Sequence, residues 1–244
     1  MNKILVFVPT YNERANVDRL YIQLKNLGLP FDILFCDDNS PDDTGKILDE
    51  LARHDQTVRV MHRPAKLGLG TAHLAAFKYA HKNHYNYLIT MDADGTHDPK
   101  YIPLILEKKD KYDIIIGSRW AGKGVMYGWG RFRLFFTNFW RNMIKHGLAM
   151  PYDCMGAFRL YNVAILNEAA IKNLRSQGFC FNLESLYRFL QRGATVYEVP
   201  IEARNRDRGE SKLSTKIMRE TAKMYFILLY DRLFYAKQTT AKRS

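Results

Sequence analysis

Cysteines and long hydrophobic runs are scarce in this sequence, and each shortage excludes a class of protein. The three cysteines, Cys36, Cys154 and Cys180, are odd in number and far apart, so they predict no disulfide framework and indicate a reducing compartment. No CxxC pair occurs, which leaves no cysteine spacing typical of a zinc site. The longest apolar run near the C-terminus, Met224–Tyr230, is far shorter than the ~18–20 residues of a membrane-spanning helix.

The sequence also lacks the common signatures of nucleotide-binding and hydrolytic folds. GxGxxG does not follow the first predicted strand, and GxxxxGK[ST], GxSxG and HExxH are absent throughout. Dinucleotide-binding, P-loop, α/β-hydrolase and zincin assignments therefore have no support. The N-terminal apolar stretch is short and has no small-residue cleavage site, so we interpret it as a strand and expect no signal peptide.

What the sequence does have is an excess of basic residues. The formal net charge is +12, and an apolar content of 47% indicates a globular fold. Residues 204–244 carry eleven Lys or Arg against four Asp or Glu, which is +7 of the total. Such a tail is suited to nucleic acid, anionic lipid headgroups or phosphorylated substrates, although a solvated basic face is an equally ordinary interpretation.

Apolar runs of strand type alternate with segments of helical spacing through Arg119. This order predicts an α/β fold, with a mostly parallel sheet flanked by helices on both faces. The expected strands are 3–9, 32–36, 58–61, 87–91, 113–117 and 195–201, with a further strand after the small-residue turn that follows Asp153. The expected helices are 13–27, with Asn12 as its cap, and 44–53, 66–82, 99–108, 131–145, 163–174, 183–191 and 214–235.

Polar side chains cluster where four of the predicted strands end. The clusters are Thr10 and Glu13, Asp37 and Asp38, Asp92 and Asp94, and Ser118 and Arg119. Ligands of open α/β sheets bind outside the carboxyl ends of the strands. Four polar clusters at one edge therefore predict a functional site there.

The acidic pair Asp92 and Asp94 is the most specific of these clusters. Residues i and i+2 of an extended segment point to the same side, so both carboxylates would face one point. Two such oxygen donors suit Mg²⁺ or Mn²⁺, which also take phosphate oxygens. A solvated, Asp-rich turn is the competing interpretation.

Two segments of the second half combine aromatic and basic residues. The helix 131–145 and the terminal helix fit amphipathic helices at a membrane surface, and core helices with snorkelling arginines are the alternative. The glycines within 122–130 are suited to a mobile lid or to an ordinary long loop.

Six motifs in order resemble family 2 glycosyltransferases of GT-A fold, and more narrowly the dolichol-phosphate mannose synthase group. They are Pro9-Thr10-Tyr11-Asn12-Glu13, Asp37–Asp42, Gly68-Leu69-Gly70-Thr71-Ala72, Asp92-Ala93-Asp94, Gly117-Ser118-Arg119 and Arg208-Gly209-Glu210-Ser211-Lys212. The resemblance covers about residues 3–215. It implies a catalytic domain at 1–213 and a basic amphipathic helix and tail at 214–244.

The resemblance also implies roles for individual residues. The nucleoside of a sugar donor would be held by Pro9, Tyr11, Glu13 and Asp38, with Cys36 near the base through its backbone. The metal would be held by Asp92, Asp94 and Thr96, and Ala93 would lie beside the donor. The acceptor phosphate would be bound by Arg119 and Arg133, and Arg206 and Lys212 would lie on a loop that closes over the phosphates.

Two departures from the family pattern stand out. Thr96 replaces a common Gln, which leaves water or His97 as alternative ligands, and Asp153–Phe158 differs from the common D-x-x-S-G-F. The second departure leaves the identity of the transferred sugar undecided.

The implied reaction is metal-dependent transfer of a hexose, with inversion, from a nucleotide sugar to a polyprenyl or dolichyl phosphate. We expect GDP-mannose as donor and the cytoplasmic membrane face as the location, with a separate membrane-anchoring subunit as a candidate partner. A UDP-glucose-type donor, and a soluble or glycan acceptor, are the alternatives. A nucleic-acid-binding role accounts for the charge but not for the polar strand ends, and a catalytically inactive lipid-binding homologue does not account for the intact acidic pair.

Overall fold

The computed structural model describes residues 2–122, 131–202 and 215–241, with the side chains of 131–133, 215–216 and 235–241 left outside the description. Its centre is a seven-stranded sheet in the order β3-β2-β1-β4-β6-β5-β7. Only β6 runs antiparallel to its neighbours among the described strands, so the predicted mostly parallel sheet is confirmed. The strands are β1 (Ile4–Thr10), β2 (Asp32–Asp37), β3 (Val58–His62), β4 (Tyr87–Thr90), β5 (Ile114–Ser118), β6 (Arg159–Asn162) and β7 (Val196–Pro200).

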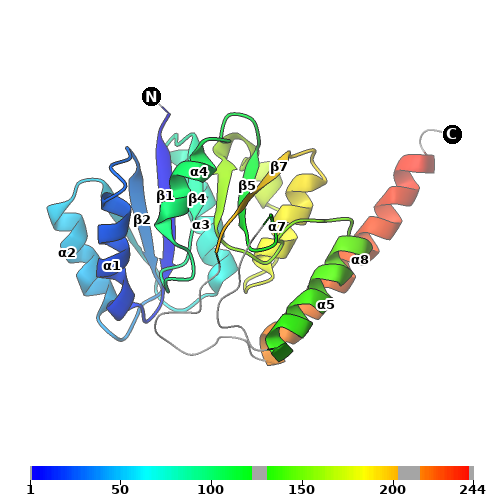
Figure 1. The fold of residues 1–244 in the computed structure, drawn as a ribbon, viewed down its shortest axis with the longest axis horizontal. Helices are drawn as coiled ribbons and strands as arrows, with labels where there is room; N and C mark the ends of the chain where they lie inside the picture. The colour runs from blue at the N-terminus through cyan, green and yellow to red at the C-terminus, as the bar shows by residue number, and fades with distance from the viewer. Residues whose placement is uncertain (1, 123–130, 203–214, 242–244) are drawn as a thin grey trace.

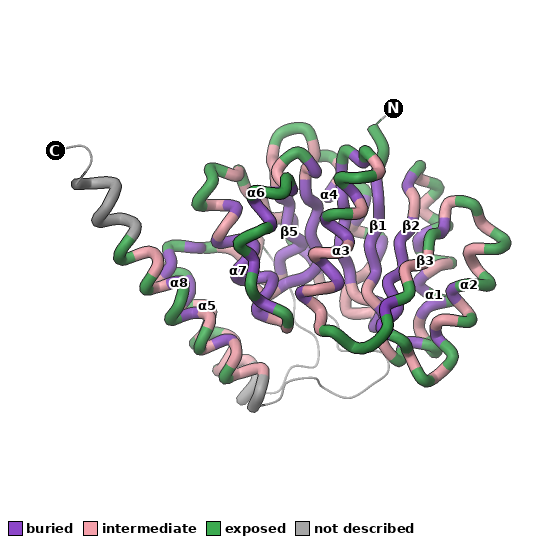
Figure 2. Tube along the Cα trace, turned by 180° about the vertical axis from the view of Figure 1, so that it is seen from behind, coloured by how far each residue is buried: buried purple, intermediate pink, exposed green. Residues whose placement is uncertain are grey.

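Helices cover both faces of the sheet, as Figures 1 and 2 show from opposite sides. One face carries α1 (Arg14–Lys25), α2 (Thr44–His54) and α4 (Ile102–Leu106), and the other carries α3 (Leu69–Lys82), α6 (Glu168–Ile171) and α7 (Phe181–Leu190). Each face has its own apolar core. The central strands are buried on both sides, which explains why they are continuous apolar runs without polar alternation.

A pair of longer helices lies beside the end of the sheet that β5 and β7 form (Figure 1). They are α5 (Arg131–Gly147) and α8 (Thr215–Ala241). Trp140 of α5 meets Tyr225 of α8 edge to face, with ring centroids 6.0 Å apart. The Arg232 guanidinium of α8 donates to the Gly147 carbonyl at 2.6 Å. A cation therefore provides a hydrogen-bond donor for a carbonyl at the C-terminal end of α5. In the described ranges, no helix has the length and hydropathy needed to cross a bilayer.

Two predicted helices were wrong in extent. Residues 163–174 form a 3₁₀ turn η2 (Val163–Ile165) and the short α6, because the Asn162 and Asn167 side chains each cap a new start. Residues 99–108 likewise divide into η1 (Pro99–Tyr101), which Asp98 caps, and α4. A capping side chain inside an apolar segment restarts a helix in a new direction, and helical periodicity alone does not reveal that.

The expected capping of α1 by Asn12 was also wrong. Glu13 occupies the N-cap position, and Asn12 has a φ of 58°. The loop after β2 and the first residue of α2 accept the hydrogen bonds at the start of α1 instead. The backbone N–H groups of Asn12, Glu13 and Arg14 donate to the side chains of Ser40, Thr44 and Asp42, respectively.

Candidate functional site

The larger of two adjoining cavities lies where the strand order reverses. From β1 the chain continues to β2 and β3 on one side and returns to β4 on the other, and such a reversal is where open α/β sheets bind ligands. The cavity has a volume of about 570 Å³. It is lined by Pro9, Thr10, Tyr11, Glu13, Asp38, Lys66, Leu67, Gly68, Leu69, Ala72, Asp92, Ala93, Asp94, Gln177, Gly178, Phe179, Ile217 and Glu220.

Seven of the residues that the resemblance assigned to a sugar donor and its metal line this one cavity. They are Pro9, Tyr11, Glu13, Asp38, Asp92, Ala93 and Asp94. Cys36 does not line it, because its side chain is buried in the core under β2. The Cys36 carbonyl accepts a hydrogen bond from the Thr10 hydroxyl at 3.3 Å, so its backbone faces the strand that ends at the cavity.

The acidic pair follows a strand that ends earlier than expected. β4 stops at Thr90, so alternation along a strand does not account for the positions of Asp92 and Asp94. A turn holds Asp94 instead: its Oδ1 accepts from the Thr96 backbone N–H at 3.1 Å and from the Thr96 hydroxyl at 2.6 Å. The Asp92 backbone N–H donates to His97 Nδ1 at 2.9 Å, which fixes that nitrogen as an acceptor.

The donor chemistry of this turn fits a hard divalent cation that is completed by a ligand. Asp94 is buried and Asp92 is partly exposed, and both line the cavity. Among the described residues no group of three or more His, Cys, Asp or Glu side chains gathers into a metal cage. Mg²⁺ and similar ions in nucleotide sites are held by one or two carboxylates plus phosphate oxygens and water. Two carboxylates beside an open cavity match that pattern and do not match a closed structural zinc site.

Asp38 is held by an arginine that sequence reasoning missed. Arg63, directly after β3, donates to both Asp38 oxygens, from Nε and from Nη2, each at 2.5 Å. Its Nη1 donates to the Thr71 hydroxyl at 2.6 Å. Burial raises the pKa of Asp38, and Arg63 opposes that shift. The sequence alone did not indicate this contact, because the parallel register of β3 against β2 decides it.

A cation and an aromatic ring, those of Lys66 and Tyr11, meet at the wall of the cavity. The Lys66 ammonium lies 3.9 Å from the centre of the Tyr11 ring, within the range of a cation–π contact. Lys66 also belonged to no predicted site. Its position next to the glycine motif at 68–72 indicated that it lies near the same site.

A loop from the second half of the chain closes the cavity against that glycine motif. The Gly70 backbone N–H donates to the Gln177 carbonyl at 2.7 Å. A Cβ at Gly70 would lie 2.2 Å from the Ser176 carbonyl oxygen, so only glycine permits this approach. Glu184 of α7 anchors the loop by accepting from the backbone N–H groups of Arg175 and Ser176.

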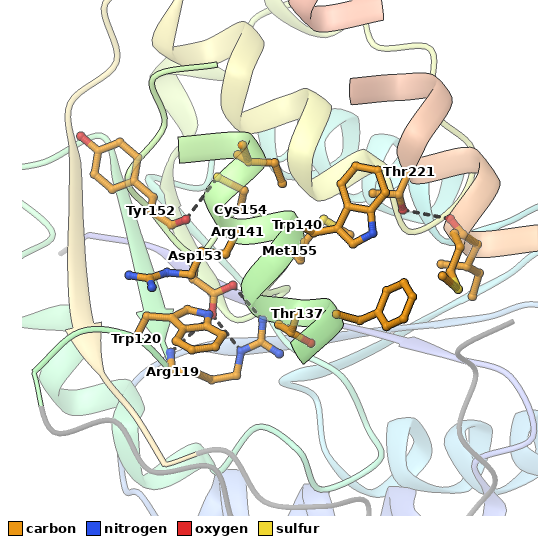
Figure 3. Close-up of a pocket in the computed structure, with 14 residues that line it drawn as sticks. Arg119, Trp120, Thr137, Trp140, Arg141, Tyr152, Asp153, Cys154, Met155 and Thr221 are labelled. Carbon is orange, nitrogen blue, oxygen red and sulfur yellow. Dashed lines mark hydrogen bonds and ion pairs between the residues drawn. The ribbon is translucent and has the colours of Figure 1, made fainter. Parts of the chain in front are cut away.

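A second, smaller cavity of about 180 Å³ lies between α5, α8 and the loop before β6 (Figure 3). Arg119, Trp120, Arg141 and Asp153 give it a polar wall. Its other walls are mainly apolar or aromatic, formed by Phe136, Thr137, Trp140, Ile144, Tyr152, Cys154, Met155, Ile217, Met218 and Thr221. Ile217 lines both cavities, so the two cavities adjoin at the start of α8.

Arg119 lies at the polar wall and is paired with Asp153. Its Nε and Nη2 donate to Asp153 Oδ2 and Oδ1 at 2.8 and 2.7 Å. Burial alone would lower the pKa of Arg119, but Asp153 and, less strongly, Asp92 raise it above its ordinary value. Arg119 thus lies within the electrostatic reach of the acidic turn while it lines the smaller cavity. Asp153 itself lines the smaller cavity and is not among the residues that line the larger one.

Three predicted cations lie outside what the structure describes. Arg206 and Lys212 fall in the undescribed range 203–214, and the side chain of Arg133 is outside the description although α5 includes its backbone. Their assigned roles stay predictions. Arg141, two turns further along α5, was not predicted and lies 4.8 Å from the Trp120 ring centre.

Comparisons with known proteins agree with this geometry. The sequence profile of glycosyl transferase family 2 matches residues 5–169. The chain is 36% identical over 221 residues to a polyprenol monophosphomannose synthase of Mycolicibacterium smegmatis, which covers 89% of this chain and 83% of that protein. It is 34% identical over 222 residues to an undecaprenyl-phosphate mannosyltransferase of Micrococcus luteus, which covers 89% of this chain and 90% of that protein.

Solved structures share the fold at much lower identity. A glucosyl-3-phosphoglycerate synthase of Mycobacterium tuberculosis, solved with Mn²⁺, UDP and phosphoglyceric acid, has a TM-score of 0.65 at 15% identity, covering 95% of this chain and 78% of that one. A mannosyltransferase of Pyrobaculum calidifontis, solved with GDP-Man and Mn²⁺, has a TM-score of 0.60 at 12% identity, covering 95% of this chain and 64% of that one. The expected GT-A type of fold is confirmed.

Proposed function

The chain belongs to glycosyltransferase family 2, and on that premise we propose that it transfers mannose, with inversion, from GDP-mannose to a polyprenyl phosphate. The observation that carries the proposal is the meeting of the two cavities. The larger has an acidic turn suited to a metal-bound diphosphate, and the smaller is mainly apolar with an arginine at its wall. The relatives named as a polyprenol monophosphomannose synthase and an undecaprenyl-phosphate mannosyltransferase support mannose as the sugar and a polyprenyl phosphate as the acceptor.

The chemical problem of this reaction is charge. A phosphate monoester has a second pKa near ~6, so the acceptor is largely dianionic at neutral pH and needs no strong base to attack the anomeric carbon. It must approach another anion, the leaving nucleoside diphosphate. Cations placed at both phosphates lower that electrostatic barrier and orient the two reactants.

We assign the donor side to the larger cavity. Asp92 and Asp94 would hold Mg²⁺ or Mn²⁺, which supplies charge neutralisation at the diphosphate when it is bound. Thr96 orients Asp94 through two hydrogen bonds, and this contact makes it a supporting residue as well as a candidate ligand. Tyr11, Glu13 and Asp38 would contact the nucleoside, with Lys66 as an added candidate.

We assign the acceptor side to the smaller cavity. Arg119, together with Arg133, would bind the lipid phosphate, and the first isoprene units would lie against the apolar walls from α5 and α8. Among the residues whose side chains the structure describes, seven of the ten exposed large apolar ones lie on these two helices: Phe135, Phe139, Phe226, Ile227, Tyr230, Leu233 and Phe234. An apolar surface of this kind suits a membrane, and we propose that the protein works peripherally at the cytoplasmic membrane face, with a separate anchoring subunit as a candidate partner.

Titration calorimetry with GDP-mannose and with UDP-glucose, each with Mn²⁺ present and absent, tests the donor. We expect tight binding of GDP-mannose that depends on the metal, and its loss in Asp94→Asn. The matched control is Asp49→Asn, which removes a half-exposed carboxylate on α2 and should bind as the wild type does. Preference for UDP-glucose would replace the donor assignment, and metal-independent binding with intact transfer would refute the metal role.

Transfer of labelled mannose to a short polyprenyl phosphate in detergent tests the acceptor. Arg133→Ala should raise the acceptor KM more than the donor KM, whereas Lys145→Ala, which removes an exposed cation of the same helix, should change neither. Transfer to a soluble sugar acceptor in place of the lipid would show that the acceptor is a glycan.

A further inference from the structure

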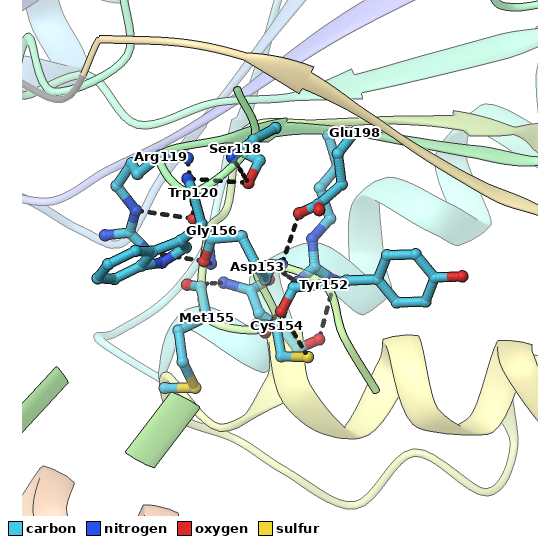
Figure 4. Close-up of polar contacts among 12 residues, drawn as sticks. Ser118, Arg119, Trp120, Tyr152, Asp153, Cys154, Met155, Gly156 and Glu198 are labelled. Atoms are coloured by element: carbon cyan, nitrogen blue, oxygen red, sulfur yellow. Dashed lines mark hydrogen bonds and ion pairs between the residues drawn. The ribbon is translucent and has the colours of Figure 1, made fainter. Parts of the chain in front are cut away.

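Both carboxylate oxygens of Asp153 accept hydrogen bonds from one edge of the Arg119 guanidinium. Oδ2 accepts from the Arg119 backbone N–H at 3.3 Å and from Nε at 2.8 Å, and Oδ1 accepts from Nη2 at 2.7 Å (Figure 4). The side chain of Asp153 is 2% exposed and that of Arg119 is 21% exposed. A two-point contact between two planar groups fixes the plane of the guanidinium as well as its position.

Asp153 is held in turn by groups from β7, from β6 and from its own loop. Its backbone N–H donates to Glu198 Oε1 of β7 at 2.7 Å, and its Oδ1 accepts from the Gly156 backbone N–H at 3.1 Å. Arg159 of β6, which is fully buried, donates to the carbonyls of Asp153 and Cys154. The carboxylate therefore has little freedom to follow Arg119 if Arg119 moves.

Glu198 connects this arrangement to the end of β5. β7 pairs with β5 in parallel, and Glu198 forms a hydrogen bond with the Ser118 side chain. The Ser118 hydroxyl oxygen accepts from the backbone N–H groups of Trp120 and Ala121. Glu198 thus contacts both Asp153 and the turn that carries Arg119, and it couples the loop before β6 to the strand end.

We propose that Asp153 and Glu198 are positioning residues that aim Arg119 at the acceptor phosphate. This inference rests on the proposed role of Arg119 in the transfer reaction. A lone arginine near the acidic turn would be drawn toward Asp92, whose charge also acts on it. The two-point contact with Asp153, which Glu198 holds in place, keeps the Arg119 guanidinium at the polar wall of the smaller cavity, where the proposed substrates would meet. Neither acid needs to touch a substrate for this role.

The competing explanation is that Asp153 only balances buried charge. Arg159 has no exposed surface, and its charge together with that of Arg119 lowers the pKa of Asp153 below the usual range, against the effect of burial. A residue of that kind would support folding and would not affect the acceptor more than the donor. The two explanations therefore differ in what they predict for kinetics.

A double-mutant cycle between Asp153→Asn and Arg119→Ala separates them, because it reports coupling between two side chains. The readouts are the acceptor KM, kcat, the affinity for GDP-mannose with Mn²⁺, and Tm. We expect Asp153→Asn to raise the acceptor KM by about tenfold to a hundredfold, as misplacement of a reacting group does, with donor affinity within twofold. In the Arg119→Ala background the same substitution should change the acceptor KM no further.

Each other outcome has a definite meaning. An equal loss from Asp153→Asn in both backgrounds, or an equal loss of donor affinity, would overturn the positioning role. An unchanged acceptor KM in Arg119→Ala alone would instead refute the proposed phosphate contact of Arg119, and with it the premise on which the positioning role rests.

Glu198 gives a second test that leaves the Arg119–Asp153–Arg159 charges in place, in case Asp153→Asn fails to fold. Glu198→Ala removes the acceptor of the Asp153 N–H, whereas Glu198→Gln retains a carbonyl oxygen there. We expect the alanine variant to raise the acceptor KM by about tenfold and the glutamine variant to restore most of that loss. Wild-type acceptor KM in the folded alanine variant would overturn the proposal.

Discussion

Tyr225 of α8 lies directly over Gly147 at the end of α5. A Cβ on Gly147 would stand 2.0 Å from the Tyr225 hydroxyl oxygen and 2.9 Å from the ring carbon that carries it. Tyr225 is 3% exposed and its ring is also packed against Trp140, so it has no room to withdraw. The two helices that enclose the smaller cavity therefore meet at a contact that only glycine allows.

Gly147→Ala should separate α5 from α8. In an open helix this substitution stabilises by roughly 0.5–1 kcal/mol, but here overpacking against a rigid ring should destabilise by about 1–3 kcal/mol. At roughly 2–4 °C per kcal/mol for a chain of this size, we expect Tm to fall by several degrees. Transfer to the lipid acceptor should fall more than GDP-mannose binding. Tyr225→Phe, which keeps the ring, is the control and should change Tm little; a rise in Tm for Gly147→Ala would contradict the contact.

Gly70, which contacts the loop that closes the larger cavity, and Gly178, which lines that cavity, form a matched pair. A Cβ at Gly70 would meet the Ser176 backbone carbonyl at 2.2 Å, whereas a Cβ at Gly178 would meet the end of the flexible Glu220 side chain at 2.7 Å. Backbone cannot move aside as a side chain can. Gly70→Ala should therefore displace the loop that includes Gln177 and weaken GDP-mannose binding by about tenfold or more.

Gly178→Ala is the control for that experiment and should bind the donor within a few-fold of the wild type. Calorimetry on both variants gives the comparison. If the two alanine variants bind GDP-mannose equally well, the loop does not form part of the donor site.

The sheet, and the gathering of polar strand ends at one cavity, followed from the sequence because both depend on strong local patterns. Short apolar runs such as Ile4–Val8 are typical of buried strands. Polar residues at the ends of such strands come together at one edge if the strands pair in parallel. The helix at 163–174 was wrong because Asn167 caps a new start within it, an effect of one side chain that periodicity does not record.

The parts of the site that were missed are contacts between distant segments. Arg63 and Asp38 are 25 residues apart, and Glu198 lies 45 residues from Asp153. Nothing in the spacing of either pair indicates contact, because register between strands decides it. The paired role of Arg119 was likewise invisible: its charge was evident in the sequence, but the carboxylate that fixes its direction was not.

The exposed aromatic residues of α5 and α8 allow a direct test of membrane binding. Phe135 is 66% and Phe226 is 60% exposed, so Phe135→Ser combined with Phe226→Ser should cost little stability. Burying each ring in a bilayer would contribute on the order of 1–2 kcal/mol. We expect the double variant to bind vesicles of anionic phospholipid at least about tenfold more weakly, with GDP-mannose affinity unchanged.

Ile22→Ser provides the control for vesicle binding. Ile22 is 54% exposed on α1, on the part of the sheet away from α5 and α8 (Figure 1), so its loss should leave flotation with vesicles as it is. Equal losses of vesicle binding in the two variants would mean that vesicles bind exposed apolar residues wherever they lie on the protein. No loss of vesicle binding in either variant would refute the proposal that α5 and α8 contact the membrane.

His73 should make the stability of the protein depend on pH in mildly acidic solution. It is buried on α3 with its ring 5.3 and 5.2 Å from those of Phe7 and Phe181, and neither ring nitrogen has a hydrogen-bond partner. Burial, and to a lesser degree the charge of Arg159, lower its pKa to about 3. In the unfolded chain a histidine titrates near ~6.5.

The direction of the effect follows from these two pKa values. Below pH ~6.5 the unfolded chain binds a proton at His73 that the folded chain does not, so the free energy of unfolding is highest above that pH and falls as the pH approaches 3, by up to ~1.4 kcal/mol per unit. Urea denaturation at pH 7.5, 6.0 and 5.0 should show this decline in the wild type. His73→Leu should flatten it, because an apolar side chain of similar size has no proton to bind. His81→Gln, at an exposed position two turns along the same helix, should keep the wild-type slope; parallel slopes for His73→Leu and wild type would mean that other groups cause the acid sensitivity.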